Sequence, residues 1–83
     1  MPGAGESWEE LEYRELLERF PLSGRTPSGP DAVALARRLG RTAGAIEAQW
    51  NDARSYCLGQ ESSAASEQLK SYLDRDGLCG GLR

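Results

Sequence analysis

Hydrophobic residues recur along the chain at the spacing of amphipathic helices, in segments separated by loops rich in proline and glycine. Near 8–20, near 31–39 and near 43–57, an apolar residue returns every three or four positions, which makes one face of each segment apolar. The three faces consist of Trp8, Leu11, Tyr13, Leu16, Leu17 and Phe20, of Ala32, Leu35, Ala36 and Leu39, and of Ala43, Ile46, Trp50, Ala53 and Cys57. This pattern predicts an all-α fold, a three-helix bundle with both tryptophans in its core.

Residues that begin or end helices stand at the ends of these segments. Ser7–Glu10 has the Ser-x-x-Glu pattern of a capping box, which predicts that the first helix begins near Trp8. The proline-rich residues 21–30 predict a connecting loop. Gly40 suits a left-handed C-cap of the second helix, and Thr42 suits the N-cap of the third.

The second and third segments together have the spacing of a helix-turn-helix motif. A small Ala36 is followed after four residues by Gly40 and after six more by the branched Ile46. The small residue lets one helix cross closely over the other, the glycine adopts the turn conformation, and the branched residue fills the space between the helices. We therefore predict a helix-turn-helix domain over residues 1–58.

For the remaining residues, 59–83, the sequence predicts a polar linker, a short fourth helix near 66–75 and a flexible tail. The fourth helix is amphipathic, with Leu69, Tyr72 and Leu73 on one face. This face either packs back on the bundle or forms the seam of a homodimer.

Residues 7–57 resemble the Myb/SANT-type three-helix domain, with one tryptophan near the start of a glutamate-rich first helix and a second tryptophan in the helix-turn-helix. Residues 41–46, with 34–36 before them and 50–52 after them, are also similar to the small helical module at the N-terminus of some bacterial HNH-type restriction endonucleases. Members of that family usually have a lysine where this chain has Gln49. The resemblance implies a DNA-binding module, either a transcription regulator or the targeting domain of a DNA-processing protein.

The outward face of the third helix carries side chains that are suited to contact with DNA bases. Off the apolar stripe lie Gly44, Glu47, Ala48, Asn51 and Arg54. Asn51 suits adenine, Arg54 suits guanine or a phosphate, and Glu47 suits the amino group of cytosine. The small Gly44 and Ala48 allow close approach to the major groove. These residues predict recognition of double-stranded DNA; the alternative is that they are ordinary exposed helix residues.

Basic residues beside the turn are suited to DNA phosphates. Arg37, Arg38 and Arg41 flank the turn, and Thr42 adds its hydroxyl and the amides of a helix N-terminus. Alternatively, Arg37 and Arg38 simply form the solvated face of the second helix.

The charge of the chain indicates a second possible role. The formal net charge is −3, and residues 6–20 carry six glutamates against two arginines. An acidic first helix suits a basic protein partner, so the alternative function is a SANT-like protein-interaction module. The direction of Glu9, Glu12 and Glu15 separates the two roles. DNA binding is disfavoured if these glutamates share a face with the arginines beside the turn, because they would repel the phosphates.

The composition argues against most catalytic classes. A chain of 83 residues has room for one small domain, and it contains no histidine, the commonest general base and metal ligand. No nucleophile motif, phosphate-binding loop or metal-ligand cluster stands in the sequence, so we expect neither an enzyme nor a cofactor. No apolar run approaches the roughly 20 residues of a membrane span.

The cysteines and the first residues give an expectation about the cellular compartment. The opening residues lack a basic region followed by an apolar stretch, so we expect a cytoplasmic protein, at the nucleoid if bacterial and in the nucleus if eukaryotic. The two cysteines, Cys57 and Cys79, are too few for a four-ligand zinc site. The two thiols could form a disulfide, but in a reducing compartment such a pair is more often free than bridged, which favours free thiols.

Overall fold

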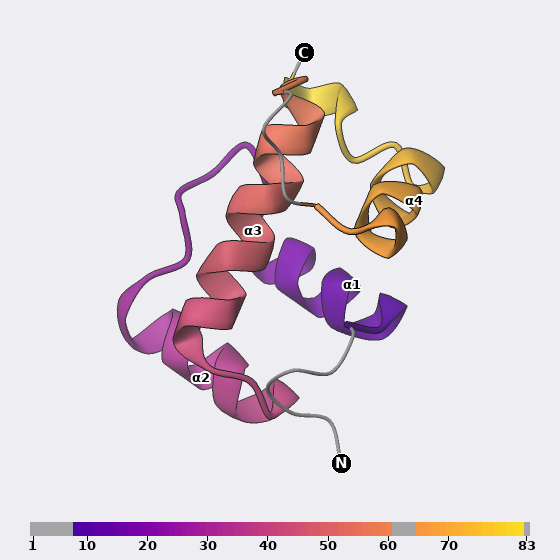
Figure 1. The fold of residues 1–83 in the computed structure, drawn as a ribbon. Coiled ribbons are helices and arrows are strands. Elements are labelled where there is room, and N and C mark those ends of the chain that lie inside the picture. The colour runs from indigo at the N-terminus through magenta and orange to yellow at the C-terminus, as the bar shows by residue number, and fades with distance from the viewer. Residues whose placement is uncertain (1–7, 61–64, 83) are drawn as a thin grey trace.

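Helices alone make up the regular structure of the described residues (Figure 1). The computed structural model describes residues 8–60 and 65–82. The elements are α1 (Glu10–Arg19), α2 (Gly29–Leu39), α3 (Ala43–Cys57), α4 (Glu67–Arg75) and a final 3₁₀ turn, η1 (Gly80–Leu82). No strand occurs in these two ranges, which confirms the all-α prediction.

The ends of α2 and α3 follow the local signals in the sequence. Gly40 adopts the left-handed conformation, with φ 68° and ψ 31°, and its N–H donates to the carbonyl of Ala36. The Thr42 hydroxyl oxygen accepts from the N–H of Ala45 at 3.1 Å, as expected of an N-cap. Only three residues therefore join the two helices, which holds them against each other.

The start of α1 differs from the prediction. Ser7 lies outside the described residues, and the N-cap is Glu9, whose N–H donates to the Glu12 carboxylate at 3.0 Å. Leu11 was expected on the apolar face, but it is 63 % exposed. At 100° per residue, Leu11 lies on the side of α1 opposite the buried Tyr13 and Leu17, because its position falls outside the stripe that they form.

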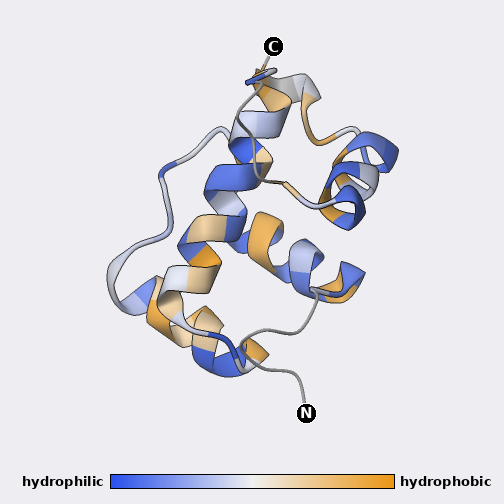
Figure 2. Cartoon of the chain, viewed as in Figure 1, coloured by the Kyte–Doolittle hydropathy of each residue, from blue (hydrophilic) through white to orange (hydrophobic). Residues whose placement is uncertain are grey.

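The core forms around α3. Helices α1, α2 and α4 each pack against α3, and α4 also packs against α1. Trp50 in α3 is fully buried, and its indole N–H donates to the carbonyl of Phe20 at 2.8 Å, which ties α3 to the end of α1. Figure 2 shows hydrophobic and hydrophilic positions alternating along each helix, as the amphipathic pattern requires.

Helix α4 belongs to this same core. Leu69 and Leu73 are fully buried and Tyr72 is nearly so, all within one hydrophobic cluster with the residues of α1 and α3. This confirms the alternative in which the fourth helix packs back on the bundle. Residues on both sides of the expected domain boundary near residue 58 therefore belong to one core.

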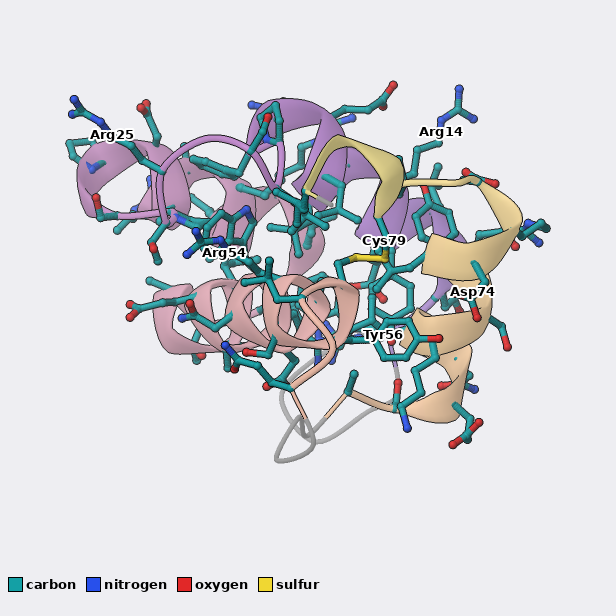
Figure 3. All side chains as sticks on the ribbon, turned by 90° about the horizontal axis from the view of Figure 1, so that it is seen from above. Arg14, Arg25, Arg54, Tyr56, Asp74 and Cys79 are labelled. Atoms are coloured by element: carbon teal, nitrogen blue, oxygen red, sulfur yellow. A yellow bond between two sulfur atoms is a disulfide. The ribbon has the colours of Figure 1, made fainter. Side chains whose placement is uncertain are left out.

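The C-terminal segment is fixed to α3 by a disulfide, where free thiols and a flexible tail were expected. Cys57, at the end of α3, is bonded to Cys79 across a sequence separation of 22 residues (Figure 3). Leu78 and Leu82 on either side of Cys79 pack partly buried against the core. The expectation failed because the return of α4 brings the two Cα atoms to 4.8 Å, within the usual bonding range, and no local rule reports that approach.

Candidate functional site

The outward face of α3 is exposed where the sequence predicted it. Gly44, Glu47, Ala48, Asn51 and Arg54 are all exposed. The Arg54 guanidinium lies 5.8 Å from the centroid of the Trp50 ring, so part of this side chain packs along α3. In Figure 3, Arg14 and Arg25 point outward at opposite sides of the molecule.

Arg41 lies in the interior, although phosphate contact was predicted for it. Its side chain is only 2 % exposed. Its Nε and one terminal nitrogen each donate to an oxygen of the Glu12 carboxylate at 2.9 Å, and its guanidinium lies 5.1 Å from the centroid of the Trp8 ring. This two-bond geometry uses the planar fork of arginine to join α1 to the turn before α3. A side chain held in this way does not reach a phosphate on the surface.

The other three residues predicted to bind phosphate lie at the surface in different settings. Arg38 is paired with Glu15, its Nε 2.5 Å from the carboxylate oxygen, although 61 % of the Arg38 side chain is exposed. Arg37 is exposed and forms no ion pair with another described residue. Thr42 is exposed, with its hydroxyl oxygen used as the N-cap. Two of the three predicted arginines are thus held by glutamates of α1.

The glutamates of α1 take part in a series of ion pairs. Four of them meet an arginine, in the pairs Glu10–Arg75, Glu12–Arg41, Glu15–Arg38 and Glu18–Arg14. The pKa of Glu12 lies below its ordinary value of 4.5, chiefly because Arg41 donates hydrogen bonds to its carboxylate. Burial of the Glu12 carboxylate raises its pKa, but this effect is smaller than that of the Arg41 hydrogen bonds. Two of the four pairs therefore join the acidic helix to arginines beside the turn.

Acid is expected to weaken the fold through Glu12. Because its pKa is lower in the folded protein than in the unfolded chain, its contribution is complete above pH 4.5 and is lost as the pH falls through the folded value. Urea unfolding measured from about pH 7 down to about pH 2 should show this loss. A Glu12→Leu/Arg41→Met double variant lacks the Glu12 carboxyl group. Its free energy of unfolding should therefore depend less steeply on pH below 4.5. Equal slopes for the two proteins would contradict the assignment.

A groove of about 550 Å³ lies between the start of α1 and the outer side of α4. It is lined by Trp8, Glu9, Glu10, Tyr13, Gln68, Ser71, Tyr72 and Arg75. Its floor is a row of aromatic rings, with centroids 5.6 Å apart between Trp8 and Tyr13 and 5.9 Å apart between Tyr13 and Tyr72. Burial raises the pKa of the Tyr72 hydroxyl, with a further effect from Asp76. An aromatic floor with charged and amide side chains at the rim is suited to a side chain or a short peptide segment.

Sequence reasoning missed this groove, although part of its signal was present. Gln68, Ser71, Tyr72 and Arg75 follow the spacing of one helix face, so they share a side of α4. That α4 would lie across the first turn of α1 could not be read from the chain. The groove is lined by the start of α1 and by α4, which are far apart in the sequence and are brought together only by packing in three dimensions.

Residues 8–60 and 65–82 contain neither a cluster of metal ligands nor a helix able to span a membrane. No group of three or more histidine, cysteine, aspartate or glutamate residues there has the geometry to hold a metal ion. No helix there has the length and apolar character needed to cross a membrane.

Comparisons with known proteins leave the predicted resemblance untested. The chain matches no family model, no curated protein and no solved structure. The candidate sites therefore rest on the geometry described above.

Proposed function

We propose that this chain is a protein-interaction module and that its binding site is the groove between α1 and α4. The observation that carries the proposal is the pairing of Glu12 with Arg41 and of Glu15 with Arg38. Glutamates of α1 therefore neutralise two of the three arginines beside the turn, one of them inside the core, which leaves little positive charge for DNA phosphates. The formal net charge of −3 also favours a protein partner over a polyanion.

The groove has the properties of a recognition site. Its volume of about 550 Å³ is large enough for one or two side chains of a partner. Trp8 and Tyr72 line the groove but are each only 6 % exposed, so their rings are held in place by the core. Rings held in this way lose little conformational freedom when a partner binds, which favours affinity.

DNA binding is the second candidate, favoured by the exposed outward face of α3. Asn51, Arg54 and Glu47 offer hydrogen-bonding groups there. In this proposal α2, the turn at Gly40 and α3 act as the predicted helix-turn-helix, and the resemblance to DNA-processing proteins supports it. Arg41 takes no part, so fewer phosphate contacts remain than the sequence predicted.

Two tryptophan substitutions distinguish the candidates, because each blocks one surface. Ser71→Trp fills the groove and Ala48→Trp covers the face of α3, and both positions are exposed on helices. Peptides selected on the wild-type protein from a random display library should bind Ala48→Trp normally and lose binding to Ser71→Trp. Labelled random duplex DNA, followed by fluorescence anisotropy at about 50 mM and about 200 mM salt, should not bind.

The opposite pattern would overturn the proposal. Saturable DNA binding that weakens with salt and is lost in Ala48→Trp would establish α3 as the functional surface. Thermal unfolding of both variants is the control for folding. Each variant should melt close to the wild-type protein, because substitutions at exposed positions usually change stability little.

A further inference from the structure

We infer that the partner bound in the α1–α4 groove presents an arginine side chain, which replaces Arg75 on the carboxylate of Glu10. This inference rests on the proposed function and names the chemistry of its ligand. The protein holds two of its own guanidinium groups at this place in the way that such a ligand would be held.

The chain twice places a guanidinium against both a carboxylate of α1 and an aromatic ring of the groove. Arg41 binds the Glu12 carboxylate and lies over the Trp8 ring. Arg75 binds Glu10, and its guanidinium lies 5.6 Å from the centroid of the Tyr72 ring. Arginine suits such a setting better than lysine does, because its planar group both stacks on a ring and donates two parallel hydrogen bonds.

The two pairs differ in burial, and that difference shows which one a ligand can replace. The Glu12 and Arg41 side chains are 10 % and 2 % exposed, so this pair is part of the core. The Glu10 and Arg75 side chains are 62 % and 56 % exposed at the rim of the groove. An exposed pair of this kind contributes little stability, so its exchange for an incoming guanidinium costs little.

Arg75 also has an alternative partner after displacement. Its Nε lies 3.4 Å from the carboxylate of Asp76, the next residue in the chain. The released guanidinium can therefore remain paired at the end of α4 while the ligand occupies Glu10. Glu9, exposed on the same rim, adds a second negative charge that favours a cationic ligand.

The test uses short labelled peptides of glycine and serine whose central two residues are Leu-Arg, Leu-Lys, Leu-Gln or Leu-Glu. Each is titrated into ¹⁵N-labelled protein, whose two tryptophans give two indole N–H signals. The Trp8 signal should move, because Trp8 lines the groove. The Trp50 signal is the internal reference, since this indole is buried and bonded to Phe20. The Leu-Arg peptide should bind most tightly.

Two single substitutions are expected to change the affinity for the Leu-Arg peptide in opposite directions. Glu10→Gln should weaken binding by about tenfold, because a charge-assisted hydrogen bond is lost. Arg75→Gln should strengthen binding by up to about fivefold, because the competing guanidinium is removed. Glu18→Gln and Arg14→Gln are the matched controls, since they alter an equally exposed ion pair that does not line the groove, and their effects should be much smaller.

Other results would overturn the inference in distinguishable ways. If both Glu10→Gln and Arg75→Gln weaken binding equally, the Glu10–Arg75 ion pair stabilises the shape of the groove and does not exchange with the ligand. If the Leu-Gln or Leu-Lys peptide binds as tightly as Leu-Arg, the groove has no preference for arginine, while the proposed interaction function stands. If no peptide of this set moves the Trp8 signal, the inference is wrong, and the library selection against Ser71→Trp decides the proposed function by itself.

Discussion

Replacing Glu12 by glutamine is expected to lower the free energy of unfolding by about 3 to 5 kcal/mol. The substitution removes the negative charge of Glu12 and leaves the Arg41 guanidinium charged and 2 % exposed. Removing the carboxylate that neutralises a buried charge is among the most unfavourable changes that a single substitution makes, and small domains have only about 5 to 15 kcal/mol in total. Urea unfolding followed by tryptophan fluorescence measures the effect.

Removing both charges separates the cost of losing the Glu12 carboxylate from the contribution of the ion pair itself. The Glu12→Leu/Arg41→Met double variant should recover most of the lost stability, because apolar residues of similar size often replace buried ion pairs without loss. Glu18→Gln is the matched control at an exposed pair and should change stability by less than about 0.5 kcal/mol. If Glu12→Gln is no more destabilising than Glu18→Gln, then Arg41 is not held in the core, and its predicted role in phosphate contact returns.

Loss of the disulfide should be the second large effect. Reduction opens a loop closed across 22 residues, and the chain-entropy model gives a loss of about 3 kcal/mol for a loop of this size. In a domain of this length each kcal/mol corresponds to roughly 4 to 8 °C in the melting temperature. Thermal unfolding with and without a dithiol reductant measures the difference on the same amino-acid sequence.

A variant without thiols is the control for side reactions of the reduced protein. Cys57→Ala/Cys79→Ala should melt near the reduced wild-type protein and should not respond to the reductant. Titration of thiols in the unfolded, unreduced protein should find none, since both cysteines are bonded. Free thiols, or equal melting temperatures before and after reduction, would contradict the bond. Structural disulfides persist in oxidising compartments, so these data also bear on the predicted cytoplasmic location.

Local physical rules were sufficient for α2 and α3. Gly40 tolerates the left-handed conformation, and Thr42 caps a helix with its own hydroxyl, whatever the rest of the chain does. The buried faces of these helices were predicted because apolar side chains at helical spacing must leave water together. At α1 the same rule was applied too broadly, and Leu11 was placed in the core although it is exposed.

The position of Arg41 could not be predicted in this way. A charged residue at a turn is normally exposed, so the sequence alone indicates a surface role. The residue is buried because Glu12, 29 positions earlier in the chain, supplies a carboxylate at the required distance. Pairing across such a separation depends on how α1 lies against the turn before α3, and this is a property of the whole fold.

The sequence by itself determined the four helices, most of their ends and the faces that are buried, because these depend on neighbours within a few residues. Only the tertiary structure decided the disulfide of Cys57 with Cys79, the ion pair of Glu12 with Arg41 and the groove between α1 and α4. Each of these joins residues that are distant along the chain. Their contact is set by packing around Trp50, where shape and volume decide which helix faces meet.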